Sequence, residues 1–194
     1  SIEFITDRDF ERLIKCMEIS KYHEYRDRVI IELLLDTGMR VGECLSIQMQ
    51  DIDLFKNSII LPWENTKGKK TRSVFFSNEM RKSIRLWIRH KDKYTDSVYL
   101  FPSTHNKKLS VNSLESNIRK YGERAGVPNV TPKVFRNNFA KRFLMNGGDI
   151  FTLSKLLGHS SVQVTEAAYL DLNDDDLRVQ YQRFSPIANM RRKA

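Results

Sequence analysis

The stretch YRDRVIIELLLDTGMRVGECLSI, residues 25–47, decides what kind of fold to expect. Apolar side chains dominate positions 29–35, as in a helix that is covered by protein on most sides, so we predict a buried helix. Gly38 is its expected end, because glycine readily adopts the left-handed conformation that closes many helices. A second short helix should follow in VGECLSI.

Helical periodicity recurs along most of the chain. We predict further helices after the cap candidate Thr6, over 77–91, 108–126, 131–148, 149–159 and 160–169, and a last short one in the tail. The starts rest on capping residues: Ser110 or Asn112 for the third of these helices, and Thr131 with Pro132 for the fourth. Pro186 marks an expected loose end.

A β-hairpin interrupts the helices. The expected strands, residues 52–62 and 71–76, overlap the β-branched or aromatic runs SIILPW and RSVFF, and the polar turn ENTKGKK separates them. The fold class expected is therefore α+β, mostly helical, with a small antiparallel sheet. No internal repeat or linker divides the chain, so we expect a single domain over residues 1–194 with a C-terminal tail at about 170–194.

Net charge is the most informative bulk property. The 194 residues carry a formal net charge of +9, which predicts a polyanionic partner, although many basic proteins are simply soluble. No apolar run approaches the ~20 residues of a membrane helix, and the first residues lack signal character, so we expect a cytoplasmic protein without a membrane partner. Cys16 and Cys44 indicate no disulfide framework.

Several common sites are absent from the sequence. TKGKKT lacks the glycine pattern and the ending of a phosphate-binding loop. No HExxH motif or His/Asp/Glu cluster indicates a metal site, and no G-x-S-x-G motif indicates a serine hydrolase. We therefore expect neither a metal nor another cofactor.

Two arginines stand in positions suited to binding an anion. Arg40 follows the expected helix end, and Glu43, one helical turn further on, is a carboxylate that can fix a buried arginine. Arg136 interrupts a helix whose apolar face includes Phe135 and Phe139, and its planar guanidinium suits bidentate contact with a phosphate. Each arginine alone is more simply read as a member of a surface salt bridge.

The segment LLGHSSVQVTEAAYL, residues 156–170, is more specific. Gly158 ends a short helix, His159 lies on the junction, and Ser160 is the cap candidate of the next helix. A junction histidine can reach a site formed by earlier elements, or it can be a packed core histidine. Tyr169 taken alone would be an ordinary interfacial tyrosine.

Taken in order, these pieces resemble a known family. T-G-x-R-x-x-E, a lysine in a hairpin turn, an arginine followed by Phe-Ala, L-G-H-S-S and a downstream tyrosine are similar to the catalytic domain of tyrosine recombinases, the phage integrase family. The resemblance runs from the helix at Thr6 to the tail after Tyr169. Each piece is weak, but the ordered combination is highly specific.

The resemblance implies a role for each matching residue. It makes Arg40 and Arg136 the two catalytic arginines, Glu43 a supporting carboxylate, Lys67 the hairpin lysine, His159 the histidine of the LGH motif and Tyr169 the nucleophile. Because the turn is rich in lysine, Lys69 or Lys70 remains an alternative to Lys67.

The sequence departs from the family pattern in two places. Lys133 stands three residues before Arg136, where the family usually has histidine; we interpret it as a substituted donor in the active site. The spacing from His159 to Tyr169 is one residue longer than is common. The shorter spacing would end on Ala168, whose side chain cannot act as a nucleophile.

The implied activity is site-specific recombination of double-stranded DNA. The resemblance implies strand cleavage and rejoining through a covalent 3′-phosphotyrosine and a Holliday junction, without metal or ATP, by a homotetramer on paired sites. A relaxation enzyme similar to type IB topoisomerases is the nearest alternative. A family member that binds DNA without cutting it, or a general basic nucleic-acid-binding module, would be of a different class.

The resemblance also bears on the two ends of the chain. The family usually carries an N-terminal DNA-clamping domain, which is missing from this sequence, so we expect a fragment of a larger integrase. The C-terminal tail either packs on a neighbouring subunit or covers its own domain.

Overall fold

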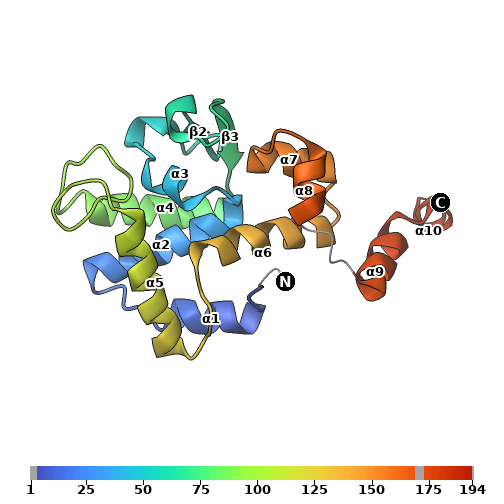
Figure 1. Cartoon of the computed structure of the whole chain (residues 1–194), viewed down its shortest axis with the longest axis horizontal. Coiled ribbons are helices and arrows are strands. Elements are labelled where there is room, and N and C mark those ends of the chain that lie inside the picture. The colour runs from blue at the N-terminus through green and yellow to red at the C-terminus, as the bar shows by residue number, and fades with distance from the viewer. Residues whose placement is uncertain (1–3, 169–172, 194) are drawn as a thin grey trace.

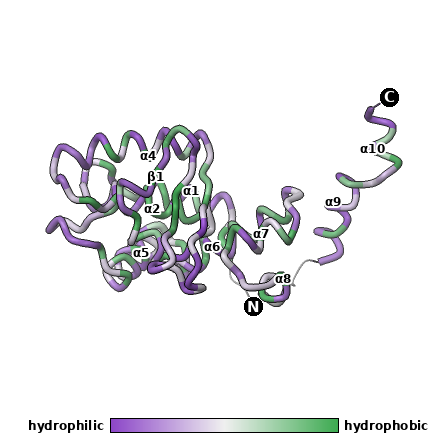
Figure 2. The backbone as a smooth tube through the Cα atoms, turned by 90° about the horizontal axis from the view of Figure 1, so that it is seen from above, coloured by the Kyte–Doolittle hydropathy of each residue, from purple (hydrophilic) through white to green (hydrophobic). Residues whose placement is uncertain are grey.

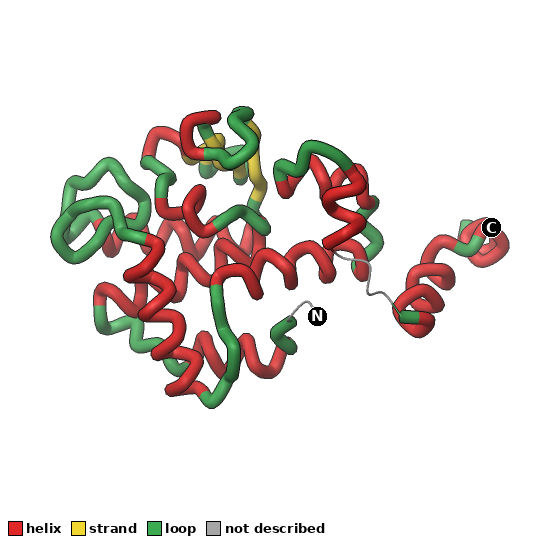
Figure 3. Tube along the Cα trace, viewed as in Figure 1, coloured by secondary structure: helices red, strands yellow, loops and turns green. Residues whose placement is uncertain are grey.

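The computed structural model describes residues 4–168 and 173–193. Helices dominate the described residues, and three short strands form one small sheet (Figure 3). The α-helices are α1 (Asp7–Lys15), α2 (Tyr22–Thr37), α3 (Val41–Leu45), α4 (Asn78–Lys91), α5 (Val111–Ala125), α6 (Pro132–Met145), α7 (Ile150–Leu157), α8 (Val162–Ala168), α9 (Asp174–Phe184) and α10 (Pro186–Arg192). The strands are β1 (Ile52–Asp53), β2 (Ser58–Leu61) and β3 (Arg72–Phe75), and the 3-10 helices are η1 (Met49–Asp51) and η2 (Trp63–Asn65).

Helix α2 lies at the centre of the domain (Figure 1). It contacts α3, α4, α5 and α6, and successive residues from Val29 to Ile31 are fully or almost fully buried. Consecutive residues of a helix point in different directions, so their common burial requires neighbours on several sides. The buried helix predicted from the sequence is confirmed, and it ends as expected at Gly38.

The sheet has three antiparallel strands in the order β1-β2-β3, where the sequence predicted a two-stranded hairpin. The expected strand over 52–62 is interrupted because the Asp53 carboxylate accepts the backbone N–H groups of Phe55 and Lys56, which turns the chain. Asn57 completes the turn with a left-handed φ of +54°. On β2 and β3, Ile59 pairs with Val74 and both are buried.

Capping residues set most helix boundaries as predicted. The Thr6 and Ser110 hydroxyls accept backbone N–H groups at the starts of α1 and α5, which decides between Ser110 and Asn112. Gly126 ends α5 in the left-handed conformation. Helix α6 starts with Pro132 at its first position, but the Thr131 side chain makes no capping hydrogen bond. The prediction of Ser160 as the cap of the next helix is wrong, because α8 begins only at Val162.

The C-terminal helices α9 and α10 extend away from the rest of the domain (Figures 1 and 2). Helix α9 touches the end of α6, where Gln180 donates to the Leu144 carbonyl and Arg183 donates to the Met145 carbonyl at 3.3 Å. The loose end predicted after Pro186 is wrong: Pro186 starts α10, because Ser185 caps this helix and proline suits a first helical position. Within residues 4–168 and 173–193, no helix is long and apolar enough to cross a membrane.

Helix α7 belongs to a second, smaller apolar cluster. Leu153 and Leu157 of α7 pack with Ala140 of α6, beside the half-buried rings of Phe139 and Phe143. The large core is formed by the elements from α1 to α6 and the sheet. The end of α7, which carries the L-G-H motif, therefore meets the main body at the edge of the principal core.

Candidate active site

Gly38 brings the Arg40 turn against helix α6. Its φ is +71°, and a Cβ on Gly38 would lie 2.2 Å from Cδ1 of Phe139, so a side chain has no space there. This close approach allows Arg136 Nη1 to donate to the Gly38 carbonyl oxygen at 2.7 Å. The two catalytic arginines predicted from the sequence, which are 96 positions apart, thus meet at the α2–α3 junction.

The end of α7 holds both guanidinium groups. The Leu157 carbonyl oxygen accepts a hydrogen bond from Arg136 Nη2 at 2.9 Å and one from Arg40 Nη1 at 3.4 Å. The last carbonyls of a helix lack partners within the helix and carry partial negative charge, so they attract cations. Gly158 then closes α7 with a φ of +73° and leads the chain directly into His159.

His159 connects the arginines to helix α8. Its Nε2 lies 3.3 Å from Arg136 Nη2, and its Nδ1 lies 2.7 Å from Oγ1 of the buried Thr165. Arginine only donates hydrogen bonds, so Nε2 accepts from it, and Nδ1 carries the proton that it donates to Thr165. Burial, followed by the charges of Arg136, Arg40 and Arg72, lowers the pKa of His159 to about 4. The imidazole is therefore neutral at neutral pH.

Four of the predicted site residues line one cavity. Arg40, Lys133, Arg136 and His159 contribute to the wall of a cavity of about 550 Å³ beside the start of α6. Lys133 is exposed and lies one helical turn before Arg136, so both side chains share a face of α6. Glu115 adds one carboxylate to the wall, but three cationic side chains outnumber it, so the concave site suits an anion such as a phosphodiester.

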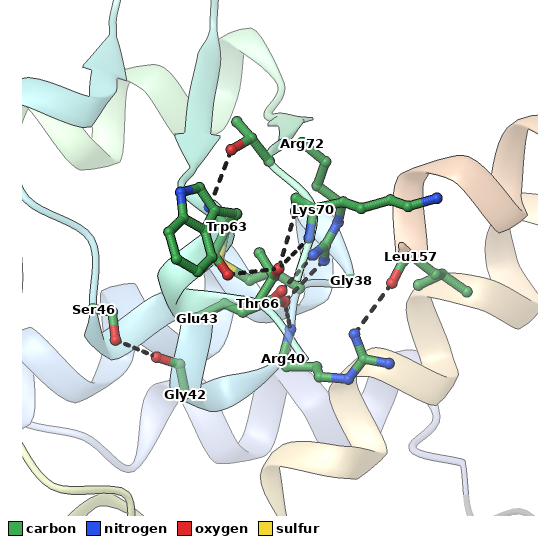
Figure 4. Close-up of polar contacts among 12 residues, drawn as sticks. Gly38, Arg40, Gly42, Glu43, Ser46, Trp63, Thr66, Lys70, Arg72 and Leu157 are labelled. Carbon is green, nitrogen blue, oxygen red and sulfur yellow. Dashed lines mark hydrogen bonds and ion pairs between the residues drawn. The ribbon is translucent and has the colours of Figure 1, made fainter. Parts of the chain in front are cut away.

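The lysine turn, residues 66–71, lies beside the end of α7 and does not line the cavity. Its shape is fixed by Thr66, whose hydroxyl donates toward the Lys70 carbonyl at 2.9 Å and accepts the Lys70 backbone N–H at 3.1 Å (Figure 4). A Cβ on Gly68 would lie 3.7 Å from the Gly158 carbonyl oxygen, so the turn passes close to the end of α7. Lys67, Lys69 and Lys70 are all exposed, and the alternatives among them stay open.

Glu43 has a different partner from the one expected. Its carboxylate accepts the backbone N–H of Arg40 at 2.8 Å, but its ion pair is with Arg72, which contacts both carboxylate oxygens (Figure 4). Sequence reasoning missed Arg72. The available signal was strand alternation: Arg72 lies two positions before the buried Val74, on the inward face of β3, where a charged side chain needs a buried partner.

Two further residues bear on the site. Sequence reasoning also missed Thr165, and its spacing of six residues from His159 gave no direct signal. Tyr169 lies outside the described residues; the described part of α8 reaches Ala168. No group of three or more His, Cys, Asp or Glu side chains that could hold a metal ion occurs in residues 4–168 and 173–193.

Comparison with known proteins decides the family. The profile of the Phage integrase family matches residues 3–176, which is most of the chain. This chain belongs to the phage integrase family. The resemblance seen in the ordered motifs is thereby confirmed, and so is the mostly helical α+β fold class.

Individual family members extend the comparison. The tyrosine recombinase XerA of Saccharolobus solfataricus is 36% identical over 156 residues, which cover 80% of this chain and 49% of XerA. The crystal structure of a XerA recombinase matches with a TM-score of 0.78 and 33% identity, covering 95% of this chain and 64% of that one.

A DNA-bound recombinase has the same fold. The structure of XerH in a post-cleavage complex with palindromic difH matches with a TM-score of 0.75 and 19% identity, covering 94% of this chain and 53% of XerH. This chain spans about half the length of the curated XerA relative.

Proposed function

We propose that this chain is the catalytic domain of a site-specific tyrosine recombinase that cuts and rejoins double-stranded DNA. The observation that carries the proposal is the convergence of Arg40, Lys133, Arg136 and His159 on one cavity. Family membership supports the same activity, and the net charge of +9 suits a DNA partner. XerH, which shares the fold, is known in a complex with DNA.

The arginines would hold the scissile phosphate. Negative charge on the non-bridging oxygens repels a nucleophile, and guanidinium groups stabilise the charge that builds in the transition state. Arg40 and Arg136 already face the cavity while bound to the Leu157 carbonyl. Lys133 adds a third positive charge at the start of α6, where the helix dipole also favours an anion.

In the cleavage step, the Tyr169 oxygen attacks phosphorus and the bond from phosphorus to the 5′ oxygen breaks. The product is a 3′-phosphotyrosine and a free 5′ hydroxyl, and the covalent link keeps the bond energy for rejoining. A lysine of the turn, Lys67 in our assignment, gives a proton to the leaving 5′ oxygen. In the unbound chain the Nε2 lone pair of neutral His159 accepts from Arg136; when that guanidinium turns to the bound phosphate, the lone pair is released to take the phenolic proton.

Assembly into a homotetramer is part of the proposal. Large apolar side chains on α9 and α10 are exposed in the single chain: Leu177, Val179, Tyr181, Phe184, Ile187 and Met190. Side chains of this kind gathered on two projecting helices are typical of a surface that another subunit covers. This arrangement favours the tail packing on a neighbour over a tail that covers its own domain.

A nicked suicide DNA substrate tests the proposal. The wild-type chain should form a covalent protein–DNA adduct, because the cleaved fragment diffuses away and rejoining is blocked, and Tyr169→Phe should abolish the adduct. Tyr94→Phe removes the hydroxyl of an exposed tyrosine elsewhere in the chain and is the matched control that should retain the adduct. An adduct that persists in Tyr169→Phe would exclude Tyr169 as the nucleophile.

DNA binding without cleavage is the alternative, and the relatives, which are named recombinases, do not favour it. Its one motive is Lys133, because lysine cannot exchange a proton near neutral pH as histidine can. This candidate predicts binding to the suicide DNA with no adduct. The Lys133→His variant then measures how lysine at this position affects the cleavage rate. A large rise in cleavage would show a weakened wild-type site, and a fall would show that lysine belongs to the working site.

A further inference from the structure

Arg72 joins three elements around the candidate site. On β3 it forms a bidentate ion pair with Glu43 of α3, and its Nε donates to the Leu156 carbonyl of α7 at 3.3 Å. The Arg72 side chain is 13% exposed and that of Glu43 only 2%, so the pair is largely shielded from water. Such a pair is fixed in orientation, because losing one partner leaves a buried charge unpaired.

Gly158 is the point where Arg72 and the lysine turn both reach α7. A Cβ on Gly158 would lie 2.9 Å from Cζ of Arg72, so the guanidinium packs against the bare backbone. Gly68 approaches the carbonyl oxygen of the same residue. The turn is thus held to the junction at its end, where β3 begins, by the hydrogen bond and ion pair of Arg72, and its middle passes close to the Gly158 carbonyl.

Arg72 itself is placed to organise the site and not to touch DNA. Its Nε and both Nη atoms have acceptors within the protein, and its side chain does not line the cavity of about 550 Å³. The lysine turn, in contrast, carries three exposed ammonium groups on a short loop. A loop of this kind gives a precise proton donor only if its ends are anchored, because an error of about 1 Å can cost 10²-fold in rate.

We infer that Arg72 is a positioning residue for leaving-group protonation: it holds the lysine turn against the end of α7, so that the lysine ammonium reaches the departing 5′ oxygen. The inference rests on the proposed function. The Glu43 carboxylate binds the Arg72 guanidinium and also accepts the backbone N–H of Arg40. Arg40 and the lysine turn are thereby placed through one carboxylate.

A DNA substrate with sulfur in place of the bridging 5′ oxygen tests this role. A thiolate leaves without protonation, so the substrate removes the need for a general acid and leaves the rest of the reaction unchanged. Arg72→Lys and Arg72→Ala should cleave ordinary DNA roughly 10²-fold more slowly than wild type. On the sulfur substrate both variants should regain most of the lost cleavage rate. Lys67→Ala should regain it too; if Lys69 or Lys70 is the general acid, the alanine variant of that lysine should do so instead.

Arg26→Lys is the matched control. Arg26 is also a buried arginine with a carboxylate partner, Asp27, and it donates to the Pro102 carbonyl. Arg26 lies about three turns of α2 away from Gly38 and so away from the candidate site. Its substitution should leave the ratio of the two cleavage rates at the wild-type value. Thermal unfolding shows which variants are folded; if Arg72→Ala is not, Arg72→Lys, which keeps the charge, decides.

Equal slowing of Arg72→Lys on both substrates would overturn the inference, because the defect would then lie in phosphate binding or in attack by the nucleophile. Failure of the proposed function would look different: wild type would form no adduct on either DNA. If wild type is active and no lysine variant of the turn recovers on the sulfur substrate, general-acid catalysis by the turn is refuted, and the inference about Arg72 with it.

Discussion

Replacing Gly38 by alanine should destabilise the domain more than the same change at either of two other glycines. The left-handed φ of +71° costs an L-residue about 1–2 kcal/mol. The new Cβ would also lie 2.2 Å from the Phe139 ring, and overpacking of this kind costs about 1–3 kcal/mol. The free energy of unfolding should therefore fall by about 2–5 kcal/mol.

Gly126 and Gly42 separate the two costs. Gly126 has nearly the same φ, +70°, but its Cβ would meet only the end of the flexible Arg12 side chain, so Gly126→Ala should lose about 1–2 kcal/mol. Gly42 lies inside α3 with no atom within 4 Å of an added Cβ, and Gly42→Ala should gain about 0.5–1 kcal/mol.

Urea denaturation followed by circular dichroism measures all three variants. For a chain of this size each 1 kcal/mol corresponds to about 2–4 °C in Tm, so Gly38→Ala should also melt about 4–20 °C below wild type. A loss for Gly38→Ala no greater than that for Gly126→Ala would refute the argument that Phe139 packs against the backbone there. At temperatures where it is folded, Gly38→Ala should also form the DNA adduct more slowly, because the Arg136 contact with the Gly38 carbonyl is disturbed.

Three further predictions concern His159 and Glu43. Thr165→Val removes the acceptor of the Nδ1 proton and should slow adduct formation roughly tenfold with little loss of fold, as measured by suicide-substrate kinetics; an unchanged rate would show that Thr165 does not orient the ring. Because the folded pKa of His159, about 4, lies below its ordinary 6.5, the unfolded chain binds more protons between these values. Stability should therefore fall as pH drops through 6.5 toward 4, and His159→Gln should lessen that fall; an NMR titration placing the pKa near 6.5 would contradict this. Glu43→Gln leaves the Arg72 charge without its counterion and should cost about 3–5 kcal/mol in urea denaturation, whereas a loss below 1 kcal/mol would mean that water already screens the pair.

Residues with restricted or unusual backbone conformations made much of the fold predictable. Gly38, Gly126 and Pro132 mark helix ends and starts through their own conformational preferences, which do not depend on distant contacts. Pro186 misled for the same reason, because proline is compatible with both a loose end and a first helical position. The break between β1 and β2 depends on one carboxylate, that of Asp53, which bonds its own backbone.

The candidate site was predictable in composition but not in its internal contacts. The order of Arg40, Arg136 and His159 along the chain indicated the family, and the structure brings all three to one cavity. The partner of Glu43 was not predictable, because the ion pair with Arg72 spans 29 positions and depends on how the sheet packs against α3. Local spacing carries information about neighbours on one element and little about pairs formed across elements.

The Leu157 carbonyl has a consequence for how this site can change over time. Both arginines depend on a main-chain oxygen, which every residue type supplies, while the Leu157 side chain itself is fully buried in the small cluster between α6 and α7. A substitution at position 157 therefore changes the packing of this cluster and leaves the backbone carbonyl in place. The leucine of the L-G-H motif is therefore selected by the apolar cluster that it fills, and the two hydrogen bonds that hold the arginines place no demand of their own on the side chain at this position.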